Sequence, residues 1–442
     1  MARPKSIEFR ARLVKLFPSG MLGKLARECG AVLRLRKVDP ADLFWTVVLG
    51  FGLGRVRTLA GLRRSYEKAT STTIEESSFY NRFNKGFARM LRVAVARVID
   101  TLPGMGRALE GPLAAFRDLV VTDSTVVRLR DLLEGAYPGC RTNHTKAALK
   151  AHAVLSVNGS GDNSIKITAE RRHDGPIFRV GSWVRGKLLL FDLGYFRYQL
   201  FACITRNGGY FLSRLKRSAN PLIVAVNRTH RGRAIDLVGR RVNDVLDDLE
   251  RDVLDVTVEV SFARRVYGGR CSRGSQLLRV VGVRDPETKR YHLYITNVPV
   301  DGLAAEDVQR VYAARWEVEL LFRELKSQYR IADMPSGKRH IVEALVYAAI
   351  LTLIASRRLL AEVRRKLGKD AARVPIQRWS TIFATVAQEL LALMVHAPRE
   401  TRLIARQIAT MVLHEAVDPN ASRLPLLRTV ETRTHAYHRK AA

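Results

Sequence analysis

Four polar residues, Tyr312, Arg315, Glu319 and Lys326, are spaced so that one α-helix would place them on a single face. At about 100° per residue, their side chains fall within a sector about 60° wide. Glutamate can bind a divalent metal, arginine can hold a phosphate through two hydrogen bonds, and lysine adds a point charge. A carboxylate flanked by two cations and a phenol suits chemistry on a phosphodiester.

An apolar stripe beside this polar face predicts how the helix is held against a core. Its members are Val311, Ala314, Val318, Leu321, Phe322 and Leu325. The alternative is a solvated helix whose charges form ordinary pairs at i,i+4 spacing. Motifs elsewhere in the chain distinguish between these two interpretations.

Two aspartates stand in predicted strands that a fold could bring to this helix. Leu119–Val127 is a β-branched run interrupted by Asp123, within Val-Thr-Asp-Ser-Thr. Leu188–Phe191 predicts a strand buried on both faces, followed by Asp192 within Phe-Asp-Leu-Gly-Tyr. If the strands are parallel neighbours and the helix crosses them, both aspartates meet Glu319. The alternative is that each aspartate caps a turn or ends a strand.

Other residues of the same helix compete with these assignments. Glu317 and Glu324 are rivals of Glu319, but they point about 160° away from the polar face. Trp316 directly follows Arg315 and is a candidate for stacking on an unpaired base. Packing in the core or in the wall of the site is the alternative for this tryptophan.

Composition favours a folded protein that meets a polyanion. The 442 residues are 47% hydrophobic and 26% charged, with a formal net charge of +33. Nucleic acid is the expected partner of such a basic chain, since no polybasic block stands beside an apolar span. The apolar run 341–355 predicts a buried helix that is too short to cross a bilayer. Four widely spaced cysteines indicate a reducing cytoplasm. The sequence has no Walker A motif, so we expect no nucleotide cofactor.

The pattern of predicted elements divides the chain into five regions. Residues 1–115 are helical and predicted to bind DNA, and 116–216 form the first part of an α/β core. Residues 217–300 form a mostly β insertion, with strands over 256–262, 276–283 and 291–296. Residues 301–362 complete the core and carry the helix with Glu319, and 363–442 form a helical region for DNA contact or dimerisation.

Within the N-terminal region, one segment has the composition of a DNA reader. Ser and Thr residues from Ser71 onward can cap a short helix that carries Phe79, Arg82 and Lys85. Capping groups, aromatics and cations together are typical of a helix-turn-helix-like element. A plain helical bundle explains the same apolar pattern.

These motifs together resemble the Tyr-Arg-Glu-Lys (YREK) signature of bacterial insertion-sequence DDE transposases, the cut-and-paste group. All four positions match without a gap, and the sequences around both aspartates are similar to the family's motifs. The resemblance covers roughly residues 115–360. It implies an RNase H-like (retroviral integrase-type) catalytic core with a mostly β insertion, flanked by helical N- and C-terminal regions.

The resemblance also implies roles for individual residues. Asp123, Asp192 and Glu319 would be catalytic and bind two Mg²⁺ ions, for which Mn²⁺ can substitute. The residues expected to contact phosphates of the transposon-end strand are Tyr312, Arg315 and Lys326.

The function implied is cleavage at both ends of an insertion sequence and transfer of the 3′-hydroxyls into target DNA. Family members of this signature typically form a hairpin at the transposon end and act as a dimer that cleaves in trans. The expected partners are double-stranded terminal inverted repeats, target DNA and a second copy of the chain, in a bacterial cytoplasm near the nucleoid. Two alternatives are an RNase H-fold nuclease without strand transfer and a non-catalytic DNA-binding relative.

Overall fold

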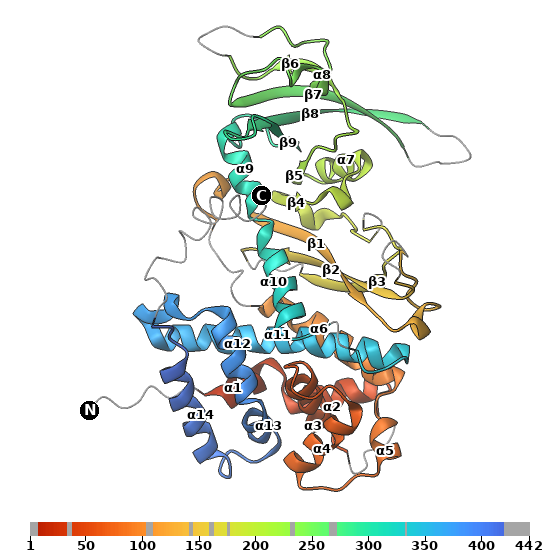
Figure 1. Ribbon diagram of the computed structural model, residues 1–442, viewed down its shortest axis with the longest axis vertical. Helices are drawn as coiled ribbons and strands as arrows, with labels where there is room; N and C mark the ends of the chain where they lie inside the picture. The colour runs from red at the N-terminus through yellow and green to blue at the C-terminus, as the bar shows by residue number, and fades with distance from the viewer. Residues whose placement is uncertain are drawn as a thin grey trace.

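The protein is elongated, with a β-rich end and a helical end (Figure 1). This computed structural model describes residues 8–32, 38–102, 109–140, 145–158, 163–174, 177–229, 235–264, 272–331 and 334–419, apart from the side chain of Glu317. The predicted basic end of the C-terminal region, beyond 419, lies outside these residues. The mixed α/β class predicted from the sequence is confirmed.

The β-rich end is one nine-stranded sheet in the order β3-β2-β1-β4-β5-β9-β8-β7-β6. β1, β4 and β5 run parallel to one another, and every other neighbouring pair is antiparallel. The strands predicted in 217–300 extend this same sheet, because β9 pairs with β5. The bounds are β1 (Asp118–Arg128), β2 (Ala148–Ser156), β3 (Ser164–Ala169), β4 (Lys187–Phe191), β5 (Tyr210–Arg214), β6 (Leu222–Val226), β7 (Val253–Ala263), β8 (Arg273–Arg284) and β9 (Tyr291–Thr296).

Helices from both ends of the chain build one helical body. Arg10 Nε donates to the carbonyl oxygen of Leu393 at 2.7 Å, and Ser65 Oγ lies 3.2 Å from Gln388 Oε1. Their apolar residues belong to one continuous core. The helices are α1 (Phe9–Leu16), α2 (Ser19–Glu28), α3 (Pro40–Thr46), α4 (Leu59–Thr70), α5 (Glu76–Tyr80), α6 (Lys85–Val98), α11 (Arg339–Leu367), α12 (Ile376–Thr385), α13 (Ala387–Val395) and α14 (Arg402–Glu415).

The axis of this body is α11, which runs beneath the sheet in Figure 1. The helical segment Arg339–Arg373 is long and apolar enough to cross a membrane, but 83% of its apolar window is buried inside the protein. The prediction of a buried helix is therefore confirmed, but α11 (Arg339–Leu367) is longer than the predicted apolar run 341–355. Thr352 of α11 donates to the carbonyl oxygen of Val48 at 2.7 Å. A Cβ on the adjacent Gly52 would lie 1.8 Å from Thr352 Oγ1, so this packing requires glycine.

The helix expected to carry all four polar residues is divided in two, which corrects the prediction of one continuous helix. α9 (Ala305–Ala313) ends just before Ala314, and α10 (Trp316–Ser327) begins after Arg315. The amides of Ala314 and Arg315 donate to carbonyls three residues back rather than four, at 3.1 and 3.0 Å. This tighter turn separates Tyr312 from the residues of α10. The members of the apolar stripe are nevertheless buried, apart from the half-buried Ala314.

Each face of the sheet has its own cover. One face packs against α10 and the helical body, through alternate residues of β1, β2 and β4. The other face packs against α7 (Tyr198–Arg206) and α8 (Val242–Val245). Side chains alternate between faces along a strand, so the face of each acid follows from its position in the strand.

Candidate active site

Asp123 lies within β1, and Asp192 directly follows the neighbouring parallel strand β4. Val121 of β1 pairs with Leu190 of β4 and both are buried toward the helical body. Continued for two residues beyond this last pair, the same register would bring Asp123 beside Asp192. Thr122 Oγ1 donates to the carbonyl oxygen of Leu190 at 3.1 Å and ties the two strands together just before the acids.

Arg315 joins Glu319 to this pair of strands. Its Nη2 lies 2.6 Å from Glu319 Oε1, and its Nη1 lies 3.4 Å from Asp123 Oδ2. The Arg315 side chain is 11% exposed, against 16% for Asp123 and 28% for Glu319. One buried guanidinium therefore stands between two of the three predicted catalytic acids.

The acids also act on one another electrostatically. Burial raises the pKa of Asp123 from 3.8 to about 6. The Ser124 amide and Arg315 oppose this rise, while the charges of Glu319 and Asp192 add to it. All three predicted acids thus lie in one electrostatic neighbourhood, where gathering negative charge is costly without a cation.

Tyr312 connects α9 to the end of β4. Its hydroxyl donates to the carbonyl oxygen of Phe191 at 3.2 Å, directly before Asp192. Burial raises the pKa of Tyr312 to about 12, with Arg315 opposing and Asp192 reinforcing the rise. Tyr312 holds the helix against the strand that carries an acid, and its contact with a DNA phosphate stays a prediction.

Two further predicted DNA contacts lie on α10. Lys326 is exposed, and burial lowers its pKa while the charge of Asp123 opposes that change. Trp316 is 42% exposed, and the Arg315 guanidinium carbon lies 5.9 Å from the centre of its ring. Both residues are thus available at the surface beside the acids, as DNA contacts would require.

The rival acid Glu324 has a structural role. It is 4% exposed, pairs with Arg357 of α11 and accepts a hydrogen bond from the Tyr329 hydroxyl at 3.2 Å. These contacts hold α10 on the helical body, so Glu324 points away from the acids as predicted. The side chain of Glu317 lies outside the described residues.

The N-terminal candidates Arg82 and Lys85 do not share the short helix predicted for them. α5 ends at Tyr80, and Asn84 caps α6 by accepting a hydrogen bond from the Phe87 amide at 2.9 Å. Arg82 therefore lies in the turn, and Lys85 is the exposed first residue of α6. Across the described ranges, neither residue forms a hydrogen bond or an ion pair with the three acids, and their DNA contacts stay predictions.

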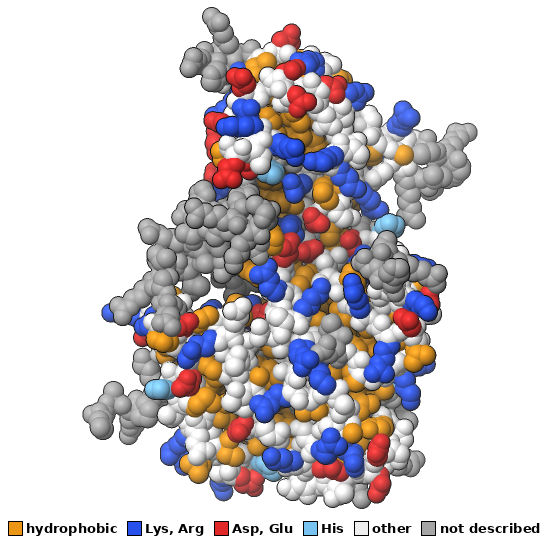
Figure 2. Space-filling view, viewed as in Figure 1, with side chains coloured by type: hydrophobic (Ala, Val, Ile, Leu, Met, Phe, Trp, Pro, Cys, Tyr) orange, Lys and Arg blue, Asp and Glu red, His pale blue; other side chains and the backbone are white. Residues whose placement is uncertain are grey.

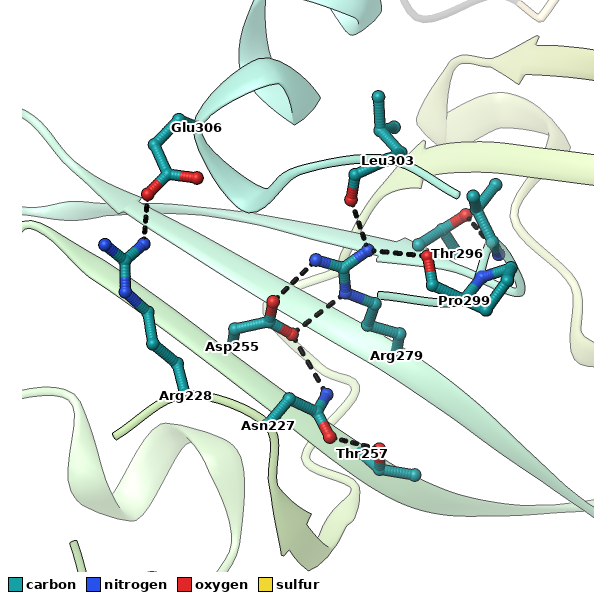
Figure 3. Close-up of polar contacts among 10 residues, drawn as sticks. Asn227, Arg228, Asp255, Thr257, Arg279, Thr296, Pro299, Leu303 and Glu306 are labelled. Atoms are coloured by element: carbon teal, nitrogen blue, oxygen red, sulfur yellow. Dashed lines mark hydrogen bonds and ion pairs between the residues drawn. The ribbon is translucent and has the colours of Figure 1, made fainter. Parts of the chain in front are cut away.

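Sequence reasoning missed a polar network that anchors the start of α9 (Figure 3). Arg279 of β8 forms a double hydrogen bond with Asp255 of β7, at 2.9 and 2.5 Å. Its Nη1 also donates to the carbonyl oxygens of Pro299 and Leu303, at 3.2 and 2.7 Å. β7 and β8 thereby fix the segment that leads into α9 and on to Glu319. The signal, an acid and an arginine 24 residues apart, becomes visible only once the β7–β8 register is known.

The donor chemistry of the site suits a divalent cation, although the spacing does not yet form a metal centre. Carboxylate oxygens are the ligands that Mg²⁺ and Mn²⁺ prefer. Within the described ranges, however, no three acid, His or Cys side chains are grouped closely enough to hold an ion. The Arg315 guanidinium supplies positive charge between Asp123 and Glu319, where a metal would otherwise supply it.

Comparison with known proteins is consistent with this arrangement. The family model described as "Transposase DDE domain" matches residues 114–355. The chain is 21% identical over 393 residues to the transposase for insertion sequence element IS231F of Bacillus thuringiensis subsp. israelensis, covering 81% of this chain and 82% of that protein. It is 19% identical over 383 residues to the transposase for IS1151 of Clostridium perfringens, covering 80% of each. The matched segment begins just before β1 and ends within α11, and the chain therefore belongs to the DDE transposase domain family.

Proposed function

We propose that this protein is the transposase of a bacterial insertion sequence, which cleaves DNA at the element's ends and joins the freed 3′-hydroxyls to target DNA. The observation that carries the proposal is that Asp123 and Glu319 share Arg315 as a partner, while the charge of Asp192 acts on Asp123. The relatives named as insertion-sequence transposases support it, because they match along about four fifths of the chain.

Asp123, Asp192 and Glu319 would hold two Mg²⁺ ions, or Mn²⁺ in their place. Bound there, divalent ions activate the attacking hydroxyl and neutralise charge on the leaving oxygen. Family members generally use a divalent metal, and the all-oxygen donor set fits one. Tyr312, Arg315 and Lys326 would contact phosphates of the transposon-end strand near the scissile bond, and Trp316 would stack on an unpaired base.

The fold supports the same proposal. Three antiparallel strands, β1 to β3, are followed by β4 and β5, which run parallel to β1, and the third acid lies on a later helix; this order agrees with an RNase H-like core. Lys and Arg side chains are spread over both ends of the molecule on the face seen in Figure 2, which suits a long duplex crossing both. We extend the proposal to a dimer that bridges two element ends, a hairpin intermediate and action in the bacterial cytoplasm.

The test is excision and joining of a marker flanked by the element's terminal repeats, in Mg²⁺, by wild type and Glu319→Gln. We expect wild type to excise and join, and the variant to lose at least about 10³-fold in rate while it still binds the ends. Glu400→Gln is the matched control, because the Glu400 side chain is 66% exposed and pairs with His396 at 3.8 Å.

Two results would contradict the proposal. Cleavage without joining by wild type would indicate the nuclease alternative. Binding without cleavage by either protein would indicate a non-catalytic DNA-binding relative, and the catalytic roles of the three acids would be wrong.

A further inference from the structure

We propose that Arg315 is an exchangeable counter-ion that makes DNA and divalent metal bind cooperatively. In the DNA-free protein its single positive charge is shared between Asp123 and Glu319, and a DNA phosphate draws it out of the site. The inference rests on the proposed function, because it assigns a regulatory step to the same acids. It adds to the proposed function that the acids bind metal more tightly once DNA has engaged Arg315.

The contacts of Arg315 show a cation that is shared between two acids. Each carboxylate receives one terminal nitrogen, with the Asp123 contact long at 3.4 Å. The guanidinium Nε is buried and has no hydrogen-bond partner within the described part of the chain. A planar guanidinium can satisfy a carboxylate through two parallel hydrogen bonds, and Arg315 completes this arrangement with neither acid.

The surroundings of Arg315 offer a route from the acids to the surface. Its guanidinium carbon lies 5.7 Å from the Tyr312 ring and 5.9 Å from the Trp316 ring. Trp316 is exposed, so the guanidinium can turn outward along aromatic surface that favours a cation. Arg315 also lies in the tight turn between α9 and α10 rather than inside either helix.

Electrostatic repulsion prevents a divalent ion and the Arg315 guanidinium from occupying the site at the same time. A divalent ion and a guanidinium cannot both lie between Asp123 and Glu319 without strong repulsion. Metal binding must therefore break both Arg315 contacts, unless a phosphate has already replaced the carboxylates as the partner of Arg315. Because linkage is reciprocal, DNA must strengthen metal binding by the same factor by which metal strengthens DNA binding.

The experiment is a titration of Mn²⁺ followed by the electron paramagnetic resonance signal of the unbound ion. Wild type and Arg315→Gln are compared with and without a duplex that carries the element's terminal repeat, after subtraction of binding to the duplex alone. Arg310→Gln is the matched control: it removes one charge from neighbouring α9, where Arg310 pairs with Asp307 at 2.7 Å.

Without DNA, we expect Arg315→Gln to bind Mn²⁺ about tenfold more tightly than wild type and Arg310→Gln. DNA should raise the Mn²⁺ affinity of wild type by about the same factor and leave that of Arg315→Gln unchanged. If Arg315→Gln does not fold, Arg315→Lys replaces it, since lysine keeps the charge but cannot contact both acids at once. That variant should show an Mn²⁺ affinity between those expected for wild type and Arg315→Gln.

The inference is overturned if Arg315→Gln, or Arg315→Lys in its place, binds Mn²⁺ no more tightly than wild type. It is also overturned if DNA raises the affinity of wild type and Arg315→Gln equally. A separate titration of Glu319→Gln tests the underlying site. Mn²⁺ binding that this variant leaves unchanged would overturn the proposed metal site, and the inference with it.

Discussion

Arginine meets carboxylate at two important places in this molecule, and the two arrangements differ in how completely they are satisfied. Arg279 gives two hydrogen bonds to the single acid Asp255 and two more to backbone carbonyls. Arg315 gives one contact to each of two acids and leaves its Nε without a partner in the described structure. The Arg279 guanidinium is therefore held in place by four hydrogen bonds, whereas the Arg315 guanidinium still has a donor that a new ligand can use.

The acids also differ in how completely their hydrogen-bonding capacity is used. Asp255 also accepts a hydrogen bond from the Asn227 side chain at 3.0 Å, and Asn227 in turn accepts one from Thr257 (Figure 3). Asp123 and Glu319 share one cation, and a third acid lies beside them. The complete network thus positions the segment that leads to Glu319, while the incomplete one lies where we propose that the chemistry takes place.

The largest effect should come from breaking the complete pair. Arg279→Met leaves Asp255 buried without a cation and frees the carbonyls that precede α9, so we expect a loss of about 3–5 kcal/mol in the free energy of unfolding. Arg315→Gln should cost about 1 kcal/mol or less, because its acids are partly exposed. Urea denaturation of both variants beside wild type measures the difference.

The double variant Asp255→Leu/Arg279→Met is the control for this prediction. It removes both charges, so we expect it to recover most of the lost stability. If Arg315→Gln is as destabilising as Arg279→Met, the distinction between a fixed and an exchangeable arginine is wrong.

A smaller effect should appear in the pH dependence of stability. The pKa of Asp123 is raised from 3.8 to about 6 on folding, so between these values the folded protein binds the proton more strongly than the unfolded chain. Stability therefore falls as pH rises through this window. Asp123→Asn has no charge to bury, so without metal its free energy of unfolding should exceed that of wild type by about 2 kcal/mol at pH 7. Most of this difference should disappear at pH 4.

Denaturation in a chelating buffer at the two pH values measures this gain. A constant difference between Asp123→Asn and wild type at both pH values would show that the charge of Asp123 is not costly in the folded protein. Arg315 would then be a sufficient counter-ion, and the acids would not be the incompletely satisfied cluster described above.

The smallest effect concerns the exposed cation of the same helix. Lys326→Gln should weaken binding to duplex DNA and reduce the slope of log affinity against log salt by about 1, as expected for one lost phosphate contact. Fluorescence anisotropy over a series of salt concentrations measures the slope. An unchanged slope would mean that Lys326 does not contact a phosphate.

Local patterns in the sequence predicted much of the candidate site. β-branched and fully apolar runs predicted β1, which contains Asp123, and β4, which Asp192 directly follows, and the two strands pair in parallel. The i,i+4 spacing of Arg315 and Glu319 predicted that they share a helix face, and they form an ion pair. These contacts depend on periods of two and about 3.6 residues, which a sequence displays directly.

Features set by long-range pairing were not predictable in the same way. The bond between Asp255 and Arg279 depends on the β7–β8 register, which only the folded sheet reveals. The break at Ala314 and Arg315 changes the hydrogen bonding while both residues keep right-handed helical angles, so the apolar spacing hides it. Amphipathic helices showed which faces are buried, but not that α1 and α4 pack against α13.

The packing of the first helices against the last has a consequence for synthesis of the protein. Arg10 and Leu393, which are hydrogen-bonded in the helical body, are separated by 383 residues. At a translation rate of roughly 5–20 residues per second, the N-terminal helices wait on the order of 20–80 s for the partners that complete their core. Residues of the sheet emerge earlier and close together, so we expect the strands that carry the acids to assemble on the ribosome before the helical body closes.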